Sequence, residues 1–249
     1  MSGHSKWATI KHKKGAADKA RGKLFAKLAR QIEVAAKSGG DVDANPTLRT
    51  AVQKAKAARM TNDAIDRAIK RGTGADDGGN YESIMYEGYA PGGVALMIYV
   101  LTDNRNRTGA DIRSIFTKLG GSMAEPGAVS WQFHRRGVIV TGEGVDEDTV
   151  FSTAIDAGAD DVISEGNGSF RVMTDPSDVY EIKAALDEVG IEVISADSPM
   201  VSENLVPVTD SGDAKAVLRI LEALEDNDDV QDVFSNFDIS DELMEAVAQ

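Results

Sequence analysis

The sequence predicts an α+β protein with an all-helical N-terminal domain and two ferredoxin-like α/β domains, the last inserted in the other. Apolar residues recur at helical spacing up to Gly72. Short apolar or alternating runs, typical of strands, begin at about residue 81, and the stretch GTGADDGGN at 72–80 separates the two patterns. With 249 residues, the chain is long enough to form more than one core.

Three helices are expected in the first part of the chain. An apolar stripe predicts a helix from about Ala16 to Lys37, which Gly39-Gly40 ends. Asn45-Pro46 predicts the start of a second helix, and Thr61 opens a third that ends at Gly72. The side chains expected to face the core are those of Leu24, Phe25, Leu28, Ile32, Ala35, Leu48, Val52, Ala55, Ile65, Ala68 and Ile69.

The segment 137–201 follows the order strand, helix, strand, strand, helix, strand, which is typical of a ferredoxin-like split βαβ unit. The Gly166-Asn167-Gly168 turn joins its two middle strands as a hairpin. The six expected elements are 137–143, 148–157, 160–166, 169–175, 177–189 and 191–197.

The segments that flank this unit predict a second set of the same kind. Strands are expected at 94–101, 129–133, 205–208 and 233–237, with helices near 112–119 and 214–224. The sequence YEGYAPGGVA at 86–95 is interpreted as a tight turn before the first of these strands. We therefore predict a basic helical domain over 1–75, a discontinuous α/β domain over 81–136 plus 203–249, and an inserted domain over 137–202.

Charge is distributed very unevenly along the chain. The net charge is −14, but residues 1–72 hold 17 Lys or Arg and 6 Asp or Glu, a local charge of +11. Residues 73–249 hold the other 10 basic and 35 acidic groups, a charge of −25. This asymmetry indicates an arm that binds a polyanion beside an acidic body.

The basic arm contains the first set of candidate nucleic-acid contacts. On the first helix Lys19, Lys23, Lys27, Arg30 and Lys37 fall within an arc of about 80° at roughly 100° per residue. A phosphate backbone favours such a stripe because each neutralised phosphate releases counterions. The alternative is a solvated lysine face with Trp7 packed on the helices. The candidates are Lys6, Trp7, Lys11, His12, Lys13, Lys14, Lys19, Arg21, Lys23, Lys27 and Arg30.

A second candidate site is the loop TDNRNRTGAD at 102–111, between a predicted strand and a helix. Thr108 and Asp111 have the spacing of a capping box, which would start the helix there. Free amide groups at that point, with nearby basic and amide side chains, would suit a phosphate. The alternative is a tight turn whose arginines pair with local acids. The candidates are Asn104, Arg105, Asn106 and Arg107.

Several other classes of function are disfavoured. The absence of cysteine excludes disulfides, thiolate metal sites and cysteine nucleophiles. No apolar run spans a bilayer, no secretory signal is present, and the basic start is richer in Lys than is usual for a transit peptide. No catalytic motif surrounds the three histidines, and the acidic runs at 146–148 and 225–229 are interpreted as solvated helix ends. We expect a cytoplasmic protein with no catalysis, cofactor, metal, small-molecule substrate or membrane contact.

Four stretches carry a resemblance to a known family: GHSKWATIKHKKGAADKARGKLFAKLARQI, NPTLRTAVQKAKAARMTNDAIDRAIKRG, YEGYAPGGVAL and TDNRNRT. Together they resemble the YebC/PmpR family of bacterial regulators, whose mitochondrial relatives activate translation of a cytochrome c oxidase subunit. The resemblance implies three domains, with contacts at the basic N-terminus and the 104–108 loop. Ala90 and Thr61 depart from the family's usual Gly and Pro.

The function expected from the residues and the resemblance together is a nucleic-acid-binding regulator of gene expression. One form is a transcriptional regulator that binds promoter DNA. The other is a translation factor that binds ribosomal RNA and relieves stalling at proline-rich stretches. The predominance of Lys and the lack of a recognisable DNA-binding module slightly favour RNA. A third hypothesis is a protein-interaction scaffold that uses the acidic domains.

Overall fold

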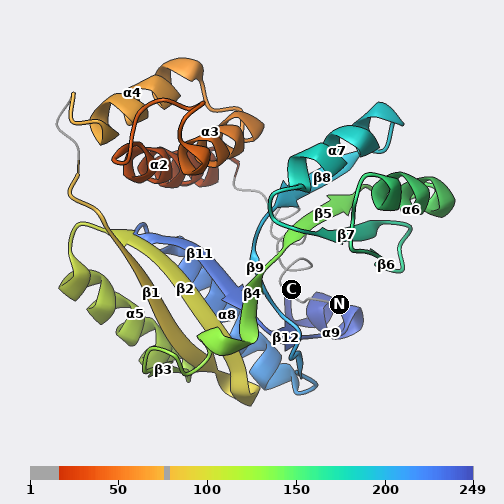
Figure 1. Ribbon diagram of the computed structural model, residues 1–249. Helices are drawn as coiled ribbons and strands as arrows, with labels where there is room; N and C mark the ends of the chain where they lie inside the picture. Colours follow the sequence, from red (N-terminus) through yellow and green to blue (C-terminus); the bar gives the residue numbers. More distant parts are fainter. Residues whose placement is uncertain (1–16, 76–78, 249) are drawn as a thin grey trace.

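The computed structural model describes residues 17–75 and 79–248, with the backbone alone for 17–20, 241, 245 and 248. It confirms the α+β class. Figure 1 shows the helices of the N-terminal group above a twisted sheet that is covered by helices on its other side, with a second, smaller sheet and its helices to one side.

The N-terminal group consists of α2 (Ala17–Ala36), α3 (Pro46–Ala57) and α4 (Asn62–Gly72). The predicted caps are confirmed, since the Asn45 side chain accepts from Leu48 N and the Thr61 side chain from Ala64 N. Ten of the expected inward positions belong to this core or pack against it. Leu24 is the exception: its side chain is 45% exposed, because it lies at the edge of the apolar stripe.

The larger sheet has the strand order β11-β2-β1-β3. Its elements are β1 (Glu82–Ala90), β2 (Val94–Thr102), α5 (Arg105–Leu119), β3 (Ser122–Ala124), α8 (Ser211–Asp226) and β11 (Val230–Ser235). Alternate residues of β2, from Val94 to Val100, join residues of α5 and α8 in one buried cluster. Both helices therefore cover the same face of this sheet.

The chain order in this sheet differs from the predicted one. β1 pairs with β2 along its whole length as an antiparallel hairpin, although 86–90 was assigned to a turn. The turn itself is confined to Pro91–Gly93, where Gly92 and Gly93 have φ of 76° and 79°. Ala90 has φ of −90°, so the turn requires no glycine at that position. The sheet keeps a ferredoxin-like arrangement, but a hairpin that precedes the first helix supplies one of its central strands.

Two further strands of this part of the chain differ from the prediction. Most of the segment 129–133 is not a strand, because residues 130–132 form the short helix η2 (Ser130–Gln132); only Phe133 belongs to a strand, β4 (Phe133–Arg135), which pairs with β9 (Met200–Ser202). The strand expected at 205–208 is reduced to β10 (Val206–Pro207), which pairs in parallel with β12 (Phe237–Asp238). A C-terminal helix that was not predicted, α9 (Asp241–Ala248), ends the described chain.

The smaller sheet confirms the predicted ferredoxin-like unit. It comprises β5 (Gly137–Thr141), α6 (Glu147–Asp156), β6 (Asp161–Ser164), β7 (Phe170–Thr174), α7 (Val179–Glu188) and β8 (Val193–Asp197). Its strand order β6-β7-β5-β8, with every neighbouring pair antiparallel, is that of the split βαβ unit.

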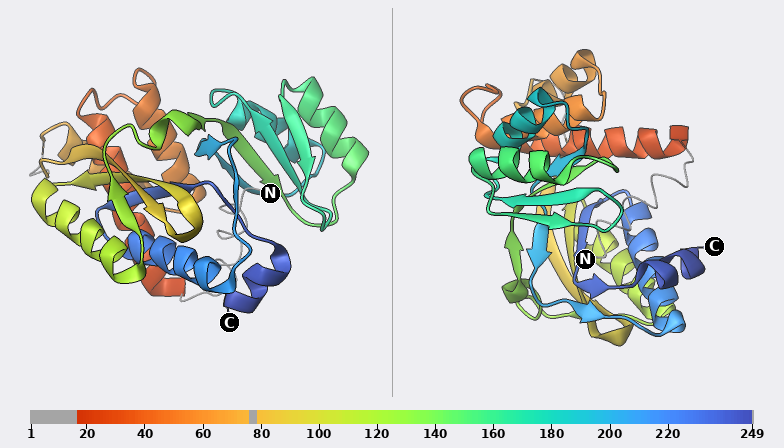
Figure 2. Two further views of the ribbon diagram at one scale, coloured as in Figure 1. Left: turned by 90° about the horizontal axis from the view of Figure 1, so that it is seen from below. Right: turned by 90° about the vertical axis from the view of Figure 1, so that its right-hand side faces the viewer.

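The three groups of elements have separate buried cores. The residues of these three cores stay within the predicted segments 1–75, 81–136 plus 203–249, and 137–202, whereas Met200 packs against a fourth, smaller cluster that contains Met97 and Phe133. The division into these domains stays a prediction, which the separate cores support. The views in Figure 2 show the smaller sheet joined to the larger one by the extended segments around β4 and β9.

A buried carboxylate fixes the loop that follows β3. Glu87 is 5% exposed and accepts hydrogen bonds from the backbone N–H groups of Gly127 (2.7 Å), Val129 (2.6 Å) and Ser130 (3.0 Å). Burial alone would raise the pKa of Glu87, but these donors outweigh it and hold the pKa below its usual value. The carboxylate of Glu87 thus supplies hydrogen-bond acceptors for three backbone amides of this loop.

We predict that Glu87→Gln lowers the free energy of unfolding by about 1–3 kcal/mol, because a neutral amide accepts fewer of these bonds and brings its own donors against them. Urea unfolding followed by circular dichroism would measure it. The matched control is Glu82→Gln, an exposed position of the same strand. Equal stability of the two variants would contradict the assigned role of Glu87.

Candidate nucleic-acid interface

The structure describes only some of the predicted contacts of the basic arm. Lys6, Trp7, Lys11, His12, Lys13 and Lys14 lie outside the described residues, and for Lys19 the structure gives only a helical backbone position. Arg21 is exposed on α2, and no ion pair joins it to another side chain that the structure describes. Lys23, Lys27 and Arg30 are described in full.

These three side chains of α2 all contact the acidic segment 225–229 at the end of α8. Lys23 Nζ lies 3.0 Å from the carbonyl oxygen of Asp226 and 3.1 Å from its Oδ1. Lys27 Nζ donates to the carbonyl oxygen of Glu225 at 2.7 Å. The cationic stripe predicted on this helix therefore faces the body of the same molecule in this structure.

Arg30 reaches deepest into this contact. Its Nη1 lies 2.8 Å from the carbonyl oxygen of Asp228, 3.0 Å from that of Leu101 and 3.1 Å from Asp229 Oδ1. Its guanidinium carbon also lies 4.8 Å from the centre of the Tyr81 ring, within cation–π range. Arg30 thereby joins α2 to the ends of two strands of the larger sheet.

Asp229 is the centre of this cluster, and its side chain is 9% exposed. Its Oδ2 accepts from the Thr108 hydroxyl (2.6 Å), from Arg107 Nη2 (2.7 Å) and from the Thr102 hydroxyl (3.1 Å). Burial alone would raise the pKa of this carboxyl, but the donors outweigh burial and lower it. In return, the hydrogen bonds and charges of Asp229 and Asp103 raise the pKa of Arg107.

Residues 104–107 form the cap and first residues of α5, in a way that differs from the prediction. Asn104 is the cap, since its side chain accepts from Arg107 N at 3.0 Å. The capping box expected at Thr108 and Asp111 is wrong, because the Thr108 hydroxyl is buried against Asp229. The four predicted contacts are all exposed: Asn104, Arg105, Asn106 and Arg107. Arg107 pairs with the carboxylates of Asp103 and Asp229, which agrees with the alternative of a turn whose arginines pair with acids.

A second polar contact joins the helical group to the smaller sheet. Lys54 Nζ on α3 lies 2.9 Å from Asp197 Oδ1 on β8. Burial would lower the pKa of Lys54, but the nearby carboxylates of Asp197 and Asp232 raise it above its usual value. Lys54 is therefore held as a cation where the three groups of elements meet.

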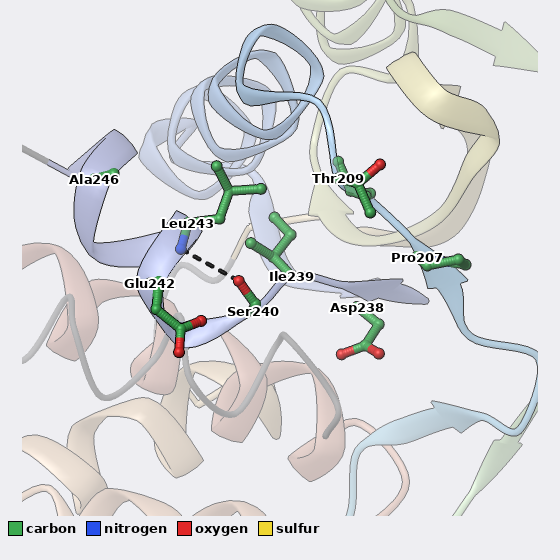
Figure 3. Close-up of a pocket in the computed structure, with 9 residues that line it drawn as sticks. Pro207, Thr209, Asp238, Ile239, Ser240, Glu242, Leu243 and Ala246 are labelled. Carbon is green, nitrogen blue, oxygen red and sulfur yellow. Dashed lines mark hydrogen bonds between the residues drawn. The ribbon is translucent and has the colours of Figure 1, made fainter.

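Two hollows in the described part of the chain are candidates for a phosphate site. One of about 360 Å³ lies at the Arg30 cluster and is lined by Arg30, Tyr81, Asp103, Arg107, Asp111, Asn227, Asp228 and Asp229. The other, of about 670 Å³, lies between β10, β12 and α9 and is lined by Pro207, Val208, Thr209, Asp238, Ile239, Ser240, Glu242, Leu243 and Ala246 (Figure 3). Acidic side chains outnumber basic ones around both, so neither suits a phosphate as it stands.

Sequence reasoning missed Asp229, which was grouped with a run of solvated acids. The signal that distinguishes it is its position directly before the buried strand that begins at Val230. Among the described residues, no helix is long and apolar enough to cross a membrane, and no three His, Asp or Glu side chains are arranged to hold a metal ion.

Comparison with known proteins places this architecture in a family. Residues 5–75 match the domain described as "TACO1/YebC protein N-terminal domain", and residues 81–237 match "TACO1/YebC second and third domain". The chain belongs to the TACO1/YebC family. These two matched segments together span most of the sequence, including both sets of candidate contacts.

Relatives of the TACO1/YebC chain are similar over its full length. A protein of Halothermothrix orenii named "Probable transcriptional regulatory protein" is 53% identical and covers 100% of each chain. A protein of Rubrobacter xylanophilus with the same name is 54% identical over the same share. A crystal structure of the conserved hypothetical protein Aq1575 from Aquifex aeolicus is 42% identical, with a TM-score of 0.78 over 90% of this chain and 93% of that one. The names of these two bacterial relatives thus describe them as regulatory proteins.

We predict that Asp229→Asn lowers the free energy of unfolding at neutral pH by about 1–3 kcal/mol, because the arginines lose a charged partner. The folded-state pKa of Asp229 is depressed, so its contribution is complete above the unfolded value of about 3.9 and is lost as the pH falls through the folded value. Urea unfolding between pH 7 and pH 3 should show the two proteins converging in acid.

Asp228→Asn is the matched control for this prediction, since Arg30 uses the backbone carbonyl of Asp228 and the substitution keeps that group. The control should differ little from the unmodified protein at any of these pH values. A constant difference between Asp229→Asn and the unmodified protein down to pH 3 would show that the ionised carboxylate is not the stabilising form.

Proposed function

We propose that this protein is a nucleic-acid-binding regulator of gene expression, without catalytic activity, that acts in the cytoplasm. The observation that carries the proposal is the separation of charge, +11 over residues 1–72 and −25 over the rest. A polyanion is attracted to the first part and repelled by the second, so the charge pattern orients it on the molecule. The candidate contacts are the basic arm and the 104–107 loop.

Exposed cations of the helical group support this proposal. The side chains of Arg21, Lys56, Arg59 and Lys70 are exposed, and none pairs with a carboxylate among the residues whose side chains the structure describes. The names of the relatives support promoter DNA as the target. Contacts from these side chains to phosphates would position the protein on the nucleic-acid backbone without recognising a base sequence.

Ribosomal RNA, and with it the ribosome, is the second candidate target, and one observation favours it. Four residues join α3 to α4, a length found in helix-turn-helix proteins, so α4 would be the helix to enter the major groove of DNA. The exposed residues near its N-terminus, which would lie closest to the bases, include Asp63, paired with Arg67 at 3.0 Å, and Asp66, whose carboxylate opposes such an approach. A role in translation, including relief of stalling at proline-rich stretches, would use the same basic arm.

We predict that the triple variant K11Q/K13Q/K14Q binds labelled RNA and duplex DNA more weakly than the unmodified protein. The slope of log K against log salt should fall by about two to three, because three phosphate contacts are lost at roughly 0.7–0.9 each. Fluorescence anisotropy at several KCl concentrations would measure both quantities. The control K118Q/K215Q/R219Q removes the same charge from exposed positions of the body and should leave the slope unchanged.

A second measurement distinguishes the two targets. If RNA is the target, the protein should sediment with ribosomes on a sucrose gradient, and K11Q/K13Q/K14Q should abolish the association. If promoter DNA is the target, a specific duplex should be protected at raised salt while the ribosome fractions stay empty. Failure to bind DNA, RNA and ribosomes in dilute buffer would overturn the proposed function.

A further inference from the structure

The cations of α2 that we expect to contact phosphates already contact oxygens of the same chain. We propose that the segment 225–229 is an intramolecular competitor for nucleic acid, so that the cationic side of α2 binds either this segment or a phosphate backbone. The inference rests on the proposed function and adds to it a mechanism of regulation: the docked form of the molecule is the form that does not use α2 for binding.

The oxygens at this contact are bound by cations that follow one another along α2. Lys23, Lys27 and Arg30 lie on one side of α2, at intervals of four and three residues, and each meets a different part of the 225–229 segment. Lysine and arginine bind phosphates with donor–acceptor distances like the 2.7–3.1 Å found here.

The segment also carries the right charge for this role. Glu225 and Asp226 lie in the last turn of α8, where the final carbonyl groups give a helix a partial negative charge. With Asp228 and Asp229, the segment presents four carboxyl groups within five residues. The cations of α2, which would attract phosphates, are thereby covered by this acidic segment.

The contact is of a kind that a polyanion can displace. The Lys23 and Asp226 side chains are 35% and 73% exposed, and exposed ion pairs contribute only about 0–1 kcal/mol. A further hydrogen bond joins this helix to the same region, from Gln31 Nε2 to Gln231 Oε1 at 3.4 Å. The core of the helical group is separate from that of the larger sheet, so undocking would break neither.

Of the three cations, Arg30 is held most firmly in the docked form. It makes three hydrogen bonds in the docked form and is only 17% exposed. A single phosphate ion could replace the partner of Lys23 but not the whole set. A nucleic-acid strand carries several phosphates and can contact all three cations together. We therefore expect nucleic acid, but not free phosphate, to displace the segment 225–229 from α2.

A cross-link tests the proposal directly. Because the chain has no cysteine, K23C/D226C places two unique thiols at positions that lie in contact. Joined by a short bis-maleimide, the molecule is held docked. RNA binding by the cross-linked protein should be at least about fivefold weaker than by the same variant blocked with a monofunctional maleimide, within the usual range of coupling between two sites.

A charge variant supplies the opposite change. E225Q/D226N/D228N removes the Lys23–Asp226 ion pair and the negative charge beside Lys27 and Arg30, while it keeps their backbone acceptors, and it should bind RNA at least about fivefold more tightly than the unmodified protein. The control E147Q/D148N/D156N removes the same charge from exposed positions of α6 and should change binding much less. Circular dichroism would confirm that all variants are folded, and inorganic phosphate should not open the docked form.

The outcomes separate this inference from the proposed function. If the unmodified protein binds RNA and the cross-linked and blocked forms bind it equally well, the competitor role is overturned while the proposed function stands. If no form binds RNA or DNA, the proposed function fails and the inference fails with it. Weakening by the cross-link together with tightening in E225Q/D226N/D228N would support both.

Discussion

The attraction between the cations of α2 and the oxygens at the end of α8 is the interaction on which the arrangement of the molecule depends. Asp229 is its centre, because it accepts from Arg30 of the helical group, from Thr102 at the end of β2, and from Arg107 and Thr108 of α5. A buried carboxylate of this kind is stable only while its donors stay in place. The basic arm and the acidic body are therefore physically coupled as well as opposite in charge.

Buried carboxylates also order two other junctions of the chain. Glu33 on α2 accepts from Arg71 Nε at 3.1 Å and from Gly79 N at 2.7 Å, so it holds the chain where it leaves the helical group. Glu87 does the same for the loop after β3. In each case one charged side chain satisfies donors from a segment that has no regular partner, which places irregular backbone at a defined position.

Local patterns in the sequence were sufficient for much of this fold. The caps at Asn45 and Thr61 and the apolar stripes of α2, α3 and α8 depend on nearby residues, and so they were predictable. β1 was missed because Glu87 and Gly88 interrupt its apolar pattern. Glycine is required there by contacts distant in sequence, since a Cβ would lie 2.6 Å from the Phe116 ring and 2.8 Å from the Ser122 carbonyl oxygen.

The candidate site was less predictable for the same reason. The cationic stripe on α2 was visible from its spacing, but its partners lie about two hundred residues away in the chain. The pairing of Arg107 with Asp229 likewise crosses 122 residues. Charge patterns indicate that a surface binds oxygen-rich anions. They do not indicate whether those oxygens belong to a phosphate backbone or to the protein itself.

Amide hydrogen exchange with and without saturating RNA tests the central claim most directly. If α2 exchanges one set of oxygens for another, backbone amides of residues 225–231 should exchange faster when RNA is bound, while those of α2 should not. Slower or unchanged exchange over 225–231 in the RNA complex would contradict the account, because the docked contact would then persist alongside the bound strand.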